Sequence, residues 1–236
     1  QEPAEDPRFS ELPRYFRQNF HYQSGGYLSD HSAALYDLQV EVLFTGAADA
    51  MRRRALAPLA QYLAGRNSRA CSALDVGCGT GRLLGMVRRN WPGLRLAGID
   101  LSEPYVEKAR RRLGETSRLR LLAAPAEALP FADASQDVVL CTFLFHELPA
   151  SVRHRAVGEM ARVLKPGGRA IVLDSLQRGD RPGWDGLLEL FPYYFHEPYY
   201  AEYVGCDLGA LFAAHGMRPA GGELAYLAKL SVFDRP

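Results

Sequence analysis

A glycine-rich turn stands between a short apolar segment and an amphipathic one. The turn reads Gly77-Cys78-Gly79-Thr80-Gly81, and Asp75 stands two residues before it. Glycines in such a turn let a ligand approach the backbone closely. The carboxylate of Asp75 would repel a pyrophosphate, whereas it suits the cationic end of an amino acid.

A second acid ends the next predicted strand. Asp100 closes the sequence Gly98-Ile99-Asp100. A carboxylate at that point can accept hydrogen bonds from both hydroxyls of a ribose, as in nucleoside cofactor sites. The turn and Asp100 together favour a nucleoside ligand over a turn that binds nothing. A dinucleotide is the alternative, but its fingerprint requires a glycine where Arg82 stands.

Two histidines are candidates for proton transfer. His146 follows a predicted strand, and His196 stands within an aromatic stretch. An imidazole can accept or donate a proton near neutral pH. For His146 the alternative is a structural role, as a cap of the next helix or as packing beneath the ligand.

The elements that must position these residues alternate regularly from Cys71 onward. The apolar runs and helical periodicity predict a sequence of strands and helices. In chain order these are strand 72–76, helix 82–90, strand 94–100, helix 103–113, strands 119–123 and 137–142, helix 151–164 and strand 169–173. Such alternation predicts an α/β fold with a doubly wound, mostly parallel sheet that is covered on both faces. A short helix at 207–215 precedes two tightly linked strands, 218–223 and 227–233, which we expect to be antiparallel.

The remaining segments differ from this pattern. Residues 1–13 are rich in proline and are expected to form a flexible leader, and residues 14–66 an N-terminal helical cap. Within the cap we expect helices at 30–44 and 49–63, with Pro58 marking a kink or a new helix start. The main domain would then be residues 67–236, interrupted at about 176–205 by an aromatic lid.

Composition narrows the function classes. The 236 residues carry a net charge of +1, which argues against broad binding to nucleic acid. No apolar run approaches the roughly 20 residues of a membrane span. The four cysteines form no C-x-x-C pair, so we expect reduced thiols in a cytoplasmic protein. No spacing of histidines, cysteines or acids indicates a metal site.

Several of these segments, in order, resemble the class I S-adenosylmethionine-dependent methyltransferases. They are most similar to the branch that includes quinone and other small-molecule methyltransferases. Residues 74–81 resemble the family's first motif, Asp100 its ribose acid, 126–131 the segment after the third strand, and 162–168 the turn into the fifth strand. The resemblance implies a Rossmann-like sheet of seven strands with an antiparallel last strand, and S-adenosylmethionine as cofactor.

The resemblance also implies roles for individual residues. The backbone at Gly77 and Gly79 would face the methionine part, and Leu101 and Ala126 the adenine. Pro125 stands where the family often has an acid, so Glu127 or the backbone would contact the adenine instead. We expect the cofactor-binding set to be Asp75, Gly77, Cys78, Gly79, Gly81, Asp100, Leu101, Ala126 and Glu127, and also Tyr27, because the N-terminal stretch around it would fold over the same opening.

The implied reaction is methyl transfer to a small, aromatic or apolar molecule at oxygen, nitrogen or carbon. His146 or His196 would act as base where the acceptor holds a proton. Aromatic side chains expected to contact the substrate are Tyr22, Phe145, Tyr194 and Tyr199. The alternatives are an NAD(P)-dependent oxidoreductase and a module that binds the cofactor without catalysis. The oligomeric state is left open.

Overall fold

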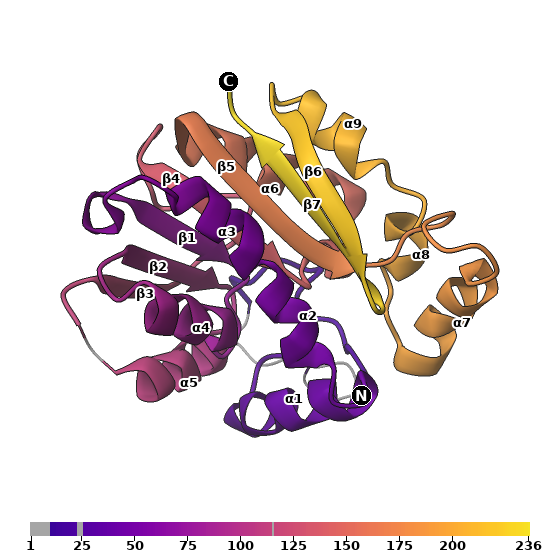
Figure 1. Cartoon of the computed structure of the whole chain (residues 1–236). Helices are drawn as coiled ribbons and strands as arrows, with labels where there is room; N and C mark the ends of the chain where they lie inside the picture. The colour runs from indigo at the N-terminus through magenta and orange to yellow at the C-terminus, as the bar shows by residue number, and fades with distance from the viewer. Residues whose placement is uncertain (1–9, 23–25, 115) are drawn as a thin grey trace.

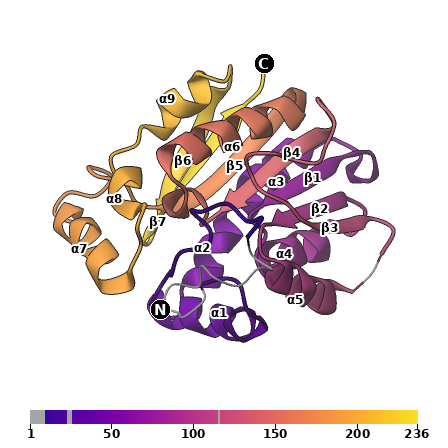
Figure 2. The same cartoon turned by 180° about the vertical axis from the view of Figure 1, so that it is seen from behind.

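The fold is a seven-stranded sheet with helices on both faces (Figures 1 and 2). It is seen in a computed structural model that describes residues 10–22, 26–114 and 116–236. The strands are β1 (Ser72–Val76), β2 (Arg95–Asp100), β3 (Leu119–Ala123), β4 (Gln136–Thr142), β5 (Leu164–Ser175), β6 (Arg218–Ala225) and β7 (Ala228–Asp234). Their order is β3-β2-β1-β4-β5-β7-β6, and β7 is antiparallel to both of its neighbours. The predicted fold class is confirmed.

The two faces of the sheet build two cores because strand side chains alternate in direction. Val139 and Cys141 pack on one side with α6 (Ala150–Val163), α8 (Tyr200–Tyr203) and α9 (Leu208–Ala213). Val138 and Leu140 pack on the other with α3 (Leu56–Leu63), α4 (Arg82–Asn90) and α5 (Glu103–Leu113). Figure 1 shows α3 in front of the sheet, and Figure 2 shows α6 in front of its other face.

The register of the parallel strands brings the candidate site residues together at one edge of the sheet. Val76 of β1 is paired with Ile99 of β2 and with Cys141 of β4. Because these strands are parallel, the residues that follow, Gly77, Asp100 and Thr142, come side by side at their carboxyl ends. This is the edge at which doubly wound sheets bind ligands.

The N-terminal region covers this same edge. It contains α1 (Asp30–Leu43), α2 (Ala48–Arg54) and the start of α3, and α1 lies below the strand ends in Figure 1. Asp37 of α1 accepts a hydrogen bond from Thr80 Oγ1 at 2.6 Å and forms an ion pair with Arg112. These contacts fix α1 directly onto the glycine-rich turn.

Several boundaries differ from the sequence-based prediction. The predicted helix 49–63 is divided at Ala55 into α2 and α3, and Pro58 lies in the first turn of α3, so the predicted new helix start is confirmed. Strand β5 begins at Leu164 because that residue pairs with Gln136 across an irregular register, before the Pro-Gly-Gly turn. The insertion at 176–205, where the sequence indicates no helix, contains α7 (Asp185–Phe195) and α8. Pro192 stands inside α7, and the last turn continues past it.

Candidate functional site

The glycine-rich turn after β1 is shaped by close approach. Gly77 has a φ of 72°, and a Cβ there would lie 3.1 Å from the Leu144 side chain. Gly81 has a φ of 77°, and a Cβ there would lie 2.9 Å from Leu113 of α5. Glycine is therefore required at both positions, at Gly77 beside the site and at Gly81 for packing between α4 and α5.

Asp100 is held directly beside this turn. Its Oδ2 accepts a hydrogen bond from the backbone N–H of Gly79 at 2.9 Å, and its Oδ1 accepts one from Ser102 at 2.9 Å. Burial raises the pKa of Asp100 to about 6, although these two hydrogen bonds oppose the rise. A carboxylate has about four acceptor positions, so two remain for the hydroxyls of a ribose.

A cavity opens between the turn, Asp100 and the N-terminal segment. Its lining includes most of the residues predicted to hold the cofactor, namely Gly77, Gly79, Asp100, Leu101, Ala126 and Tyr27. Aromatic rings of Tyr15, Phe16, Phe20, Tyr36 and Tyr105 also line it, together with Glu147. The cavity volume is about 70 Å³, which is room for a few water molecules. The N-terminal segment thus forms part of the cavity wall.

Four residues of the predicted cofactor set are not part of the lining: Gly81, described above, and Asp75, Cys78 and Glu127. Asp75 is 1% exposed, and among the described residues neither of its carboxylate oxygens has a hydrogen-bond partner. Burial and the charge of Asp100 raise the pKa of Asp75 to about 8. Cys78 is buried against Gly98, and Glu127 accepts hydrogen bonds from Tyr15 at 2.8 and 2.9 Å.

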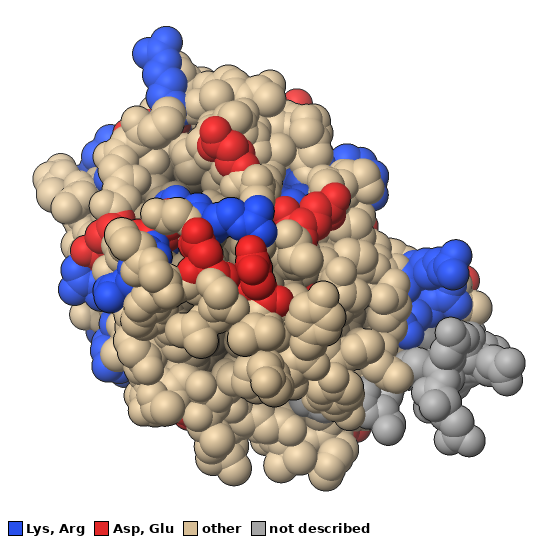
Figure 3. Space-filling model, turned by 90° about the vertical axis from the view of Figure 1, so that its right-hand side faces the viewer, with Lys and Arg blue, Asp and Glu red and all other residues tan. Residues whose placement is uncertain are grey.

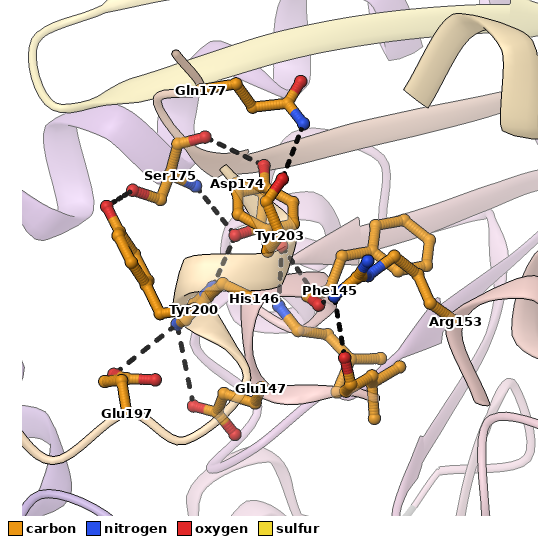
Figure 4. A network of polar contacts seen from close by, with 12 residues as sticks. Phe145, His146, Glu147, Arg153, Asp174, Ser175, Gln177, Glu197, Tyr200 and Tyr203 are labelled. Carbon is orange, nitrogen blue, oxygen red and sulfur yellow. Dashed lines mark hydrogen bonds and ion pairs between the residues drawn. The ribbon is translucent and has the colours of Figure 1, made fainter. Parts of the chain in front are cut away.

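A buried cluster of ionisable residues adjoins the cavity at Glu147. We call it the His146 cluster, and it consists of His21, His146, Glu147, Asp174 and Glu197. The Nδ1 atom of His146 lies 2.5 Å from Asp174 Oδ1. Its Nε2 atom lies 3.9 Å from both Glu147 Oε1 and Glu197 Oε1. Figure 4 shows Asp174 on one side of the imidazole and the two glutamates on the other.

Backbone hydrogen bonds hold Asp174, the acid beside His146, in place. Asp174 is fully buried at the end of β5 and accepts hydrogen bonds from the backbone of Leu144, Phe145 and Ser175. Burial alone would lower the pKa of His146, but the charges of Asp174 and Glu197 outweigh it and raise that pKa to about 10. His146 therefore carries a proton at neutral pH and serves as a hydrogen-bond donor, which argues against its predicted use as a base.

Tyr27 and His21 connect the cluster to the cavity. The hydroxyl of Tyr27 donates to Glu147 Oε1 at 2.7 Å and lies 2.7 Å from His21 Nε2. The His21 ring also lies 3.4 Å from Glu197 Oε1 through its Nδ1 atom. Burial lowers the pKa of His21, but the hydrogen bond to Glu147 and the charge of Glu197 raise it overall.

Other predicted site residues lie away from the cavity. Phe145 is fully buried and packs edge-to-face against Phe212 in the core. Tyr22 and Tyr194 are 68% and 70% exposed, and Tyr22 packs against His196 on the surface. The remaining member, Tyr199, receives a hydrogen bond from Gln18 at 2.6 Å and faces Phe20.

Sequence reasoning missed two of the acids that surround His146, Asp174 and Glu197. Asp174 carries a usable signal, because it ends an apolar strand as Asp100 does. Glu197 and His21 carry none, since only the packing of α7 and the N-terminal segment brings them to His146. The neighbour of the predicted His196, rather than His196 itself, enters the cluster.

Comparison with known proteins agrees with this geometry. Residues 73–168 match the family model described as a methyltransferase domain. This part of the chain is similar to methyltransferase domains. The match agrees with the predicted resemblance to the class I S-adenosylmethionine-dependent methyltransferases, and the oxidoreductase alternative finds no support among these relatives.

The relatives themselves include enzymes named for quinones. A demethylmenaquinone methyltransferase of Thermus thermophilus is 38% identical over 60% of this chain and 61% of its own length. A ubiquinone/menaquinone biosynthesis C-methyltransferase of Geobacter sulfurreducens is 34% identical over 60% of this chain and 54% of its own length. The matched part thus spans little more than half of each of these two relatives.

A solved structure extends the likeness to the fold. The 1,6-didemethyltoxoflavin-N1-methyltransferase of Burkholderia thailandensis, with S-adenosylhomocysteine bound, has a TM-score of 0.62 and 22% identity. The alignment covers 87% of this chain and 85% of that one. At this identity the likeness concerns the fold.

The residues at the cavity fit S-adenosylmethionine, the cofactor that the comparisons support. Gly77 and Gly79 expose backbone to the cavity, Asp100 offers free acceptor positions, and Leu101 and Ala126 offer an apolar wall. Asp75, which has no hydrogen-bond partner among the described residues, lies near the turn, and a cation beside it would stabilise its ionised form. Among the described residues, no three histidine, cysteine or acidic side chains are arranged to hold a metal ion. No helix in the described part of the chain is long and apolar enough to cross a bilayer.

Proposed function

We propose that this protein transfers the methyl group of S-adenosylmethionine to a small molecule at oxygen, nitrogen or carbon. The observation that carries the proposal is that the cavity and the His146 cluster share two residues. Glu147 and Tyr27 belong both to the cavity of the glycine-rich turn and to contacts of the His146 cluster. A cofactor at the turn and an acceptor at the cluster would therefore meet.

The residues would act mainly by alignment and by exclusion of water. When bound, the cofactor supplies an electrophilic methyl group on a sulfonium. Asp100 and the glycine-rich turn would hold one partner, and the rings of Phe16, Phe20 and Tyr27 would shield the reacting atoms. Positioning two reactants in this way accounts for a large part of catalysis in bimolecular reactions.

An aromatic or apolar acceptor suits the site best. Aromatic side chains from the N-terminal segment, α1 and α5 surround the cavity. Rings prefer to pack against rings in offset or edge-to-face arrangements. Relatives named for demethylmenaquinone and for ubiquinone/menaquinone biosynthesis support the same class of acceptor.

We further propose that residues 14–66 act as a cap and residues 176–205 as a lid on residues 67–236. The cap supplies rings to the cavity, and the lid supplies Glu197 to the cluster. The face in Figure 3 includes α7, and its lower part carries little charge. Exposed apolar side chains of α7 are Leu187, Leu190, Tyr193 and Tyr194. A cytoplasmic location, where the four free thiols stay reduced, and function without nucleic acid complete the proposal.

Parallel calorimetric titrations with S-adenosylmethionine, S-adenosylhomocysteine and NADH test the proposal. We expect both sulfur nucleosides to bind at micromolar concentration and NADH not to bind. Formation of S-adenosylhomocysteine with phenols, amines or quinols would then separate an enzyme from a module that only binds. Binding of NADH alone would contradict the proposed function.

A further inference from the structure

Glu197 has an unusual environment for a carboxylate. It follows α7 and is 2% exposed. Neither of its oxygens has a hydrogen-bond partner among the described residues. Burial of a polar group without a hydrogen bond is costly, so few folded proteins retain one without a role.

The surroundings of Glu197 direct it toward the proposed reaction centre. Its Oε1 lies 3.4 Å from His21 Nδ1 and 3.9 Å from His146 Nε2. Glu197 does not line the cavity itself. Glu147, which does, lies on the far side of these imidazoles, so an acceptor would reach Glu197 at the place that His21 now occupies. The charged groups that face Glu197 are thus His21 from the N-terminal segment, His146 and Glu147 from η4 (Phe145–Glu147), and Asp174 from β5.

We propose that Glu197 binds the O–H or N–H of the methyl acceptor and takes its proton during methyl transfer. This inference rests on the proposed function, and it restricts the substrates to phenols, hydroquinones and primary or secondary amines. The acceptor's oxygen or nitrogen forms a bond to the methyl carbon while the carbon–sulfur bond breaks. The electron pair of that bond goes to sulfur, and the acceptor's proton goes to Glu197.

Glu197 suits this role better than the histidine beside it. His146 is held by Asp174 and keeps its proton at neutral pH, so it can donate a hydrogen bond to the developing product but cannot accept a proton. Burial raises the pKa of Glu197 to about 7, against the charges of His146 and His21, which lower it. A base works best when its pKa lies near the working pH.

The test compares Glu197→Gln with Glu189→Gln. Glutamine keeps the size of Glu197 but cannot take a proton, and Glu189 is an exposed acid of the same segment whose side chain pairs with Arg178. The probes are 1,4-naphthohydroquinone, aniline and N,N-dimethylaniline, of which the last carries no N–H. We expect Glu197→Gln to lower turnover of the first two about 100-fold or more, and Glu189→Gln to leave it unchanged.

Two further readouts separate proton transfer from a structural effect. In the wild type, kcat/KM should rise as pH passes through about 7, because Glu197 must be ionised, and Glu197→Gln should lose this rise. Calorimetry on the complex with S-adenosylhomocysteine should show naphthohydroquinone binding about tenfold more weakly to Glu197→Gln, because a charged acceptor is lost.

Full turnover or unchanged hydroquinone affinity in Glu197→Gln would overturn the inference, as would efficient methylation of N,N-dimethylaniline by the wild type. The lack of binding of every probe would overturn the substrate class. Cofactor affinity should be equal in all three proteins. A wild type that fails to bind S-adenosylmethionine would instead overturn the proposed function, so the two failures are distinguishable.

Discussion

The imidazole of His146 and the carboxylate of Asp174 form a buried pair, with Nδ1 and Oδ1 2.5 Å apart. Their elements adjoin because Thr142 of β4 is paired with Leu173 of β5, which places the exit of β4 beside Asp174. Three backbone N–H groups also donate hydrogen bonds to this carboxylate and hold it in place. The orientation of the ring is therefore determined by the sheet.

Replacing Asp174 by asparagine tests this pair. We expect the pKa of His146 to fall toward its ordinary value of 6.5, since the largest opposing charge is removed. The protein should lose about 1–3 kcal/mol of unfolding free energy because a charged hydrogen bond is lost. NMR titration of the imidazole and denaturant unfolding measure the two effects, and an unchanged histidine titration would contradict the assignment.

Asp100→Ala should weaken binding of S-adenosylmethionine by about 1–3 kcal/mol, because the variant lacks the acceptor for the ribose hydroxyls. Asp133→Ala is the matched control, since Asp133 is exposed and pairs only with Arg162 among the described residues. Calorimetric titration of both variants with S-adenosylmethionine measures the difference in affinity. Equal affinities in Asp100→Ala and wild type would remove the ribose assignment.

His146→Ala should reduce turnover far more than cofactor affinity, because the imidazole faces the cluster and not the glycine-rich turn. A loss of about 100-fold in kcat is expected if the imidazolium supports proton transfer. His154→Ala, on the outer side of α6, serves as the control. Wild-type turnover in His146→Ala would exclude any essential part for this residue.

Alkaline pH should destabilise the protein through its buried acids. The pKa of Asp75 rises from 3.8 to about 8 on folding, so the unfolded chain ionises first and stability falls as pH rises from about 4 to 8. The shift corresponds to an order of 5 kcal/mol, of which Asp75→Asn should recover about 1–4 kcal/mol at pH 9. Unfolding experiments at pH 4 and pH 9 check this, because the two proteins should differ little at pH 4. A gain of equal size at both values of pH would show that ionisation is not the cause.

Deletion of residues 1–30 should open the cavity and reduce activity, because Phe16, Phe20 and Tyr27 supply rings to it and His21 reaches the cluster. A loss of affinity for S-adenosylmethionine should accompany the loss of turnover. Calorimetry and a methyl-transfer assay on the truncated protein measure both. Full activity would show that the segment is not a cap.

The sequence predicts the cofactor side of this site much better than the acceptor side. Asp100 ends a strand, Gly77 and Ala126 follow one, and parallel strands bring their carboxyl ends together whatever the surrounding helices do. The same local logic gives α4 and α5 their observed bounds, since Ser102 caps α5 and Trp91-Pro92 ends the helical pattern of α4.

The acceptor side depends on packing between distant segments. His21, Glu147, Asp174 and Glu197 come from four separate elements, and no local pattern relates them. Helix α7 escapes prediction because Pro192 and its aromatic neighbours are typical of irregular chain. The conformation of α7 and of the residues after it determines which side chains point inward. Glu197 therefore enters the cluster, while Tyr194 stays exposed.

One part of the N-terminal segment borders both the cavity and the His146 cluster. The rings of Tyr15, Phe16, Phe20 and Tyr27 line the 70 Å³ cavity, and His21 of the same segment lies between Glu147 and Glu197. A nucleoside needs far more room than this, so the segment must move to admit the cofactor, and its return over the bound cofactor would complete the His146 cluster. We therefore expect a compulsory order in steady-state kinetics, with the sulfonium compound first on and its thioether product last off.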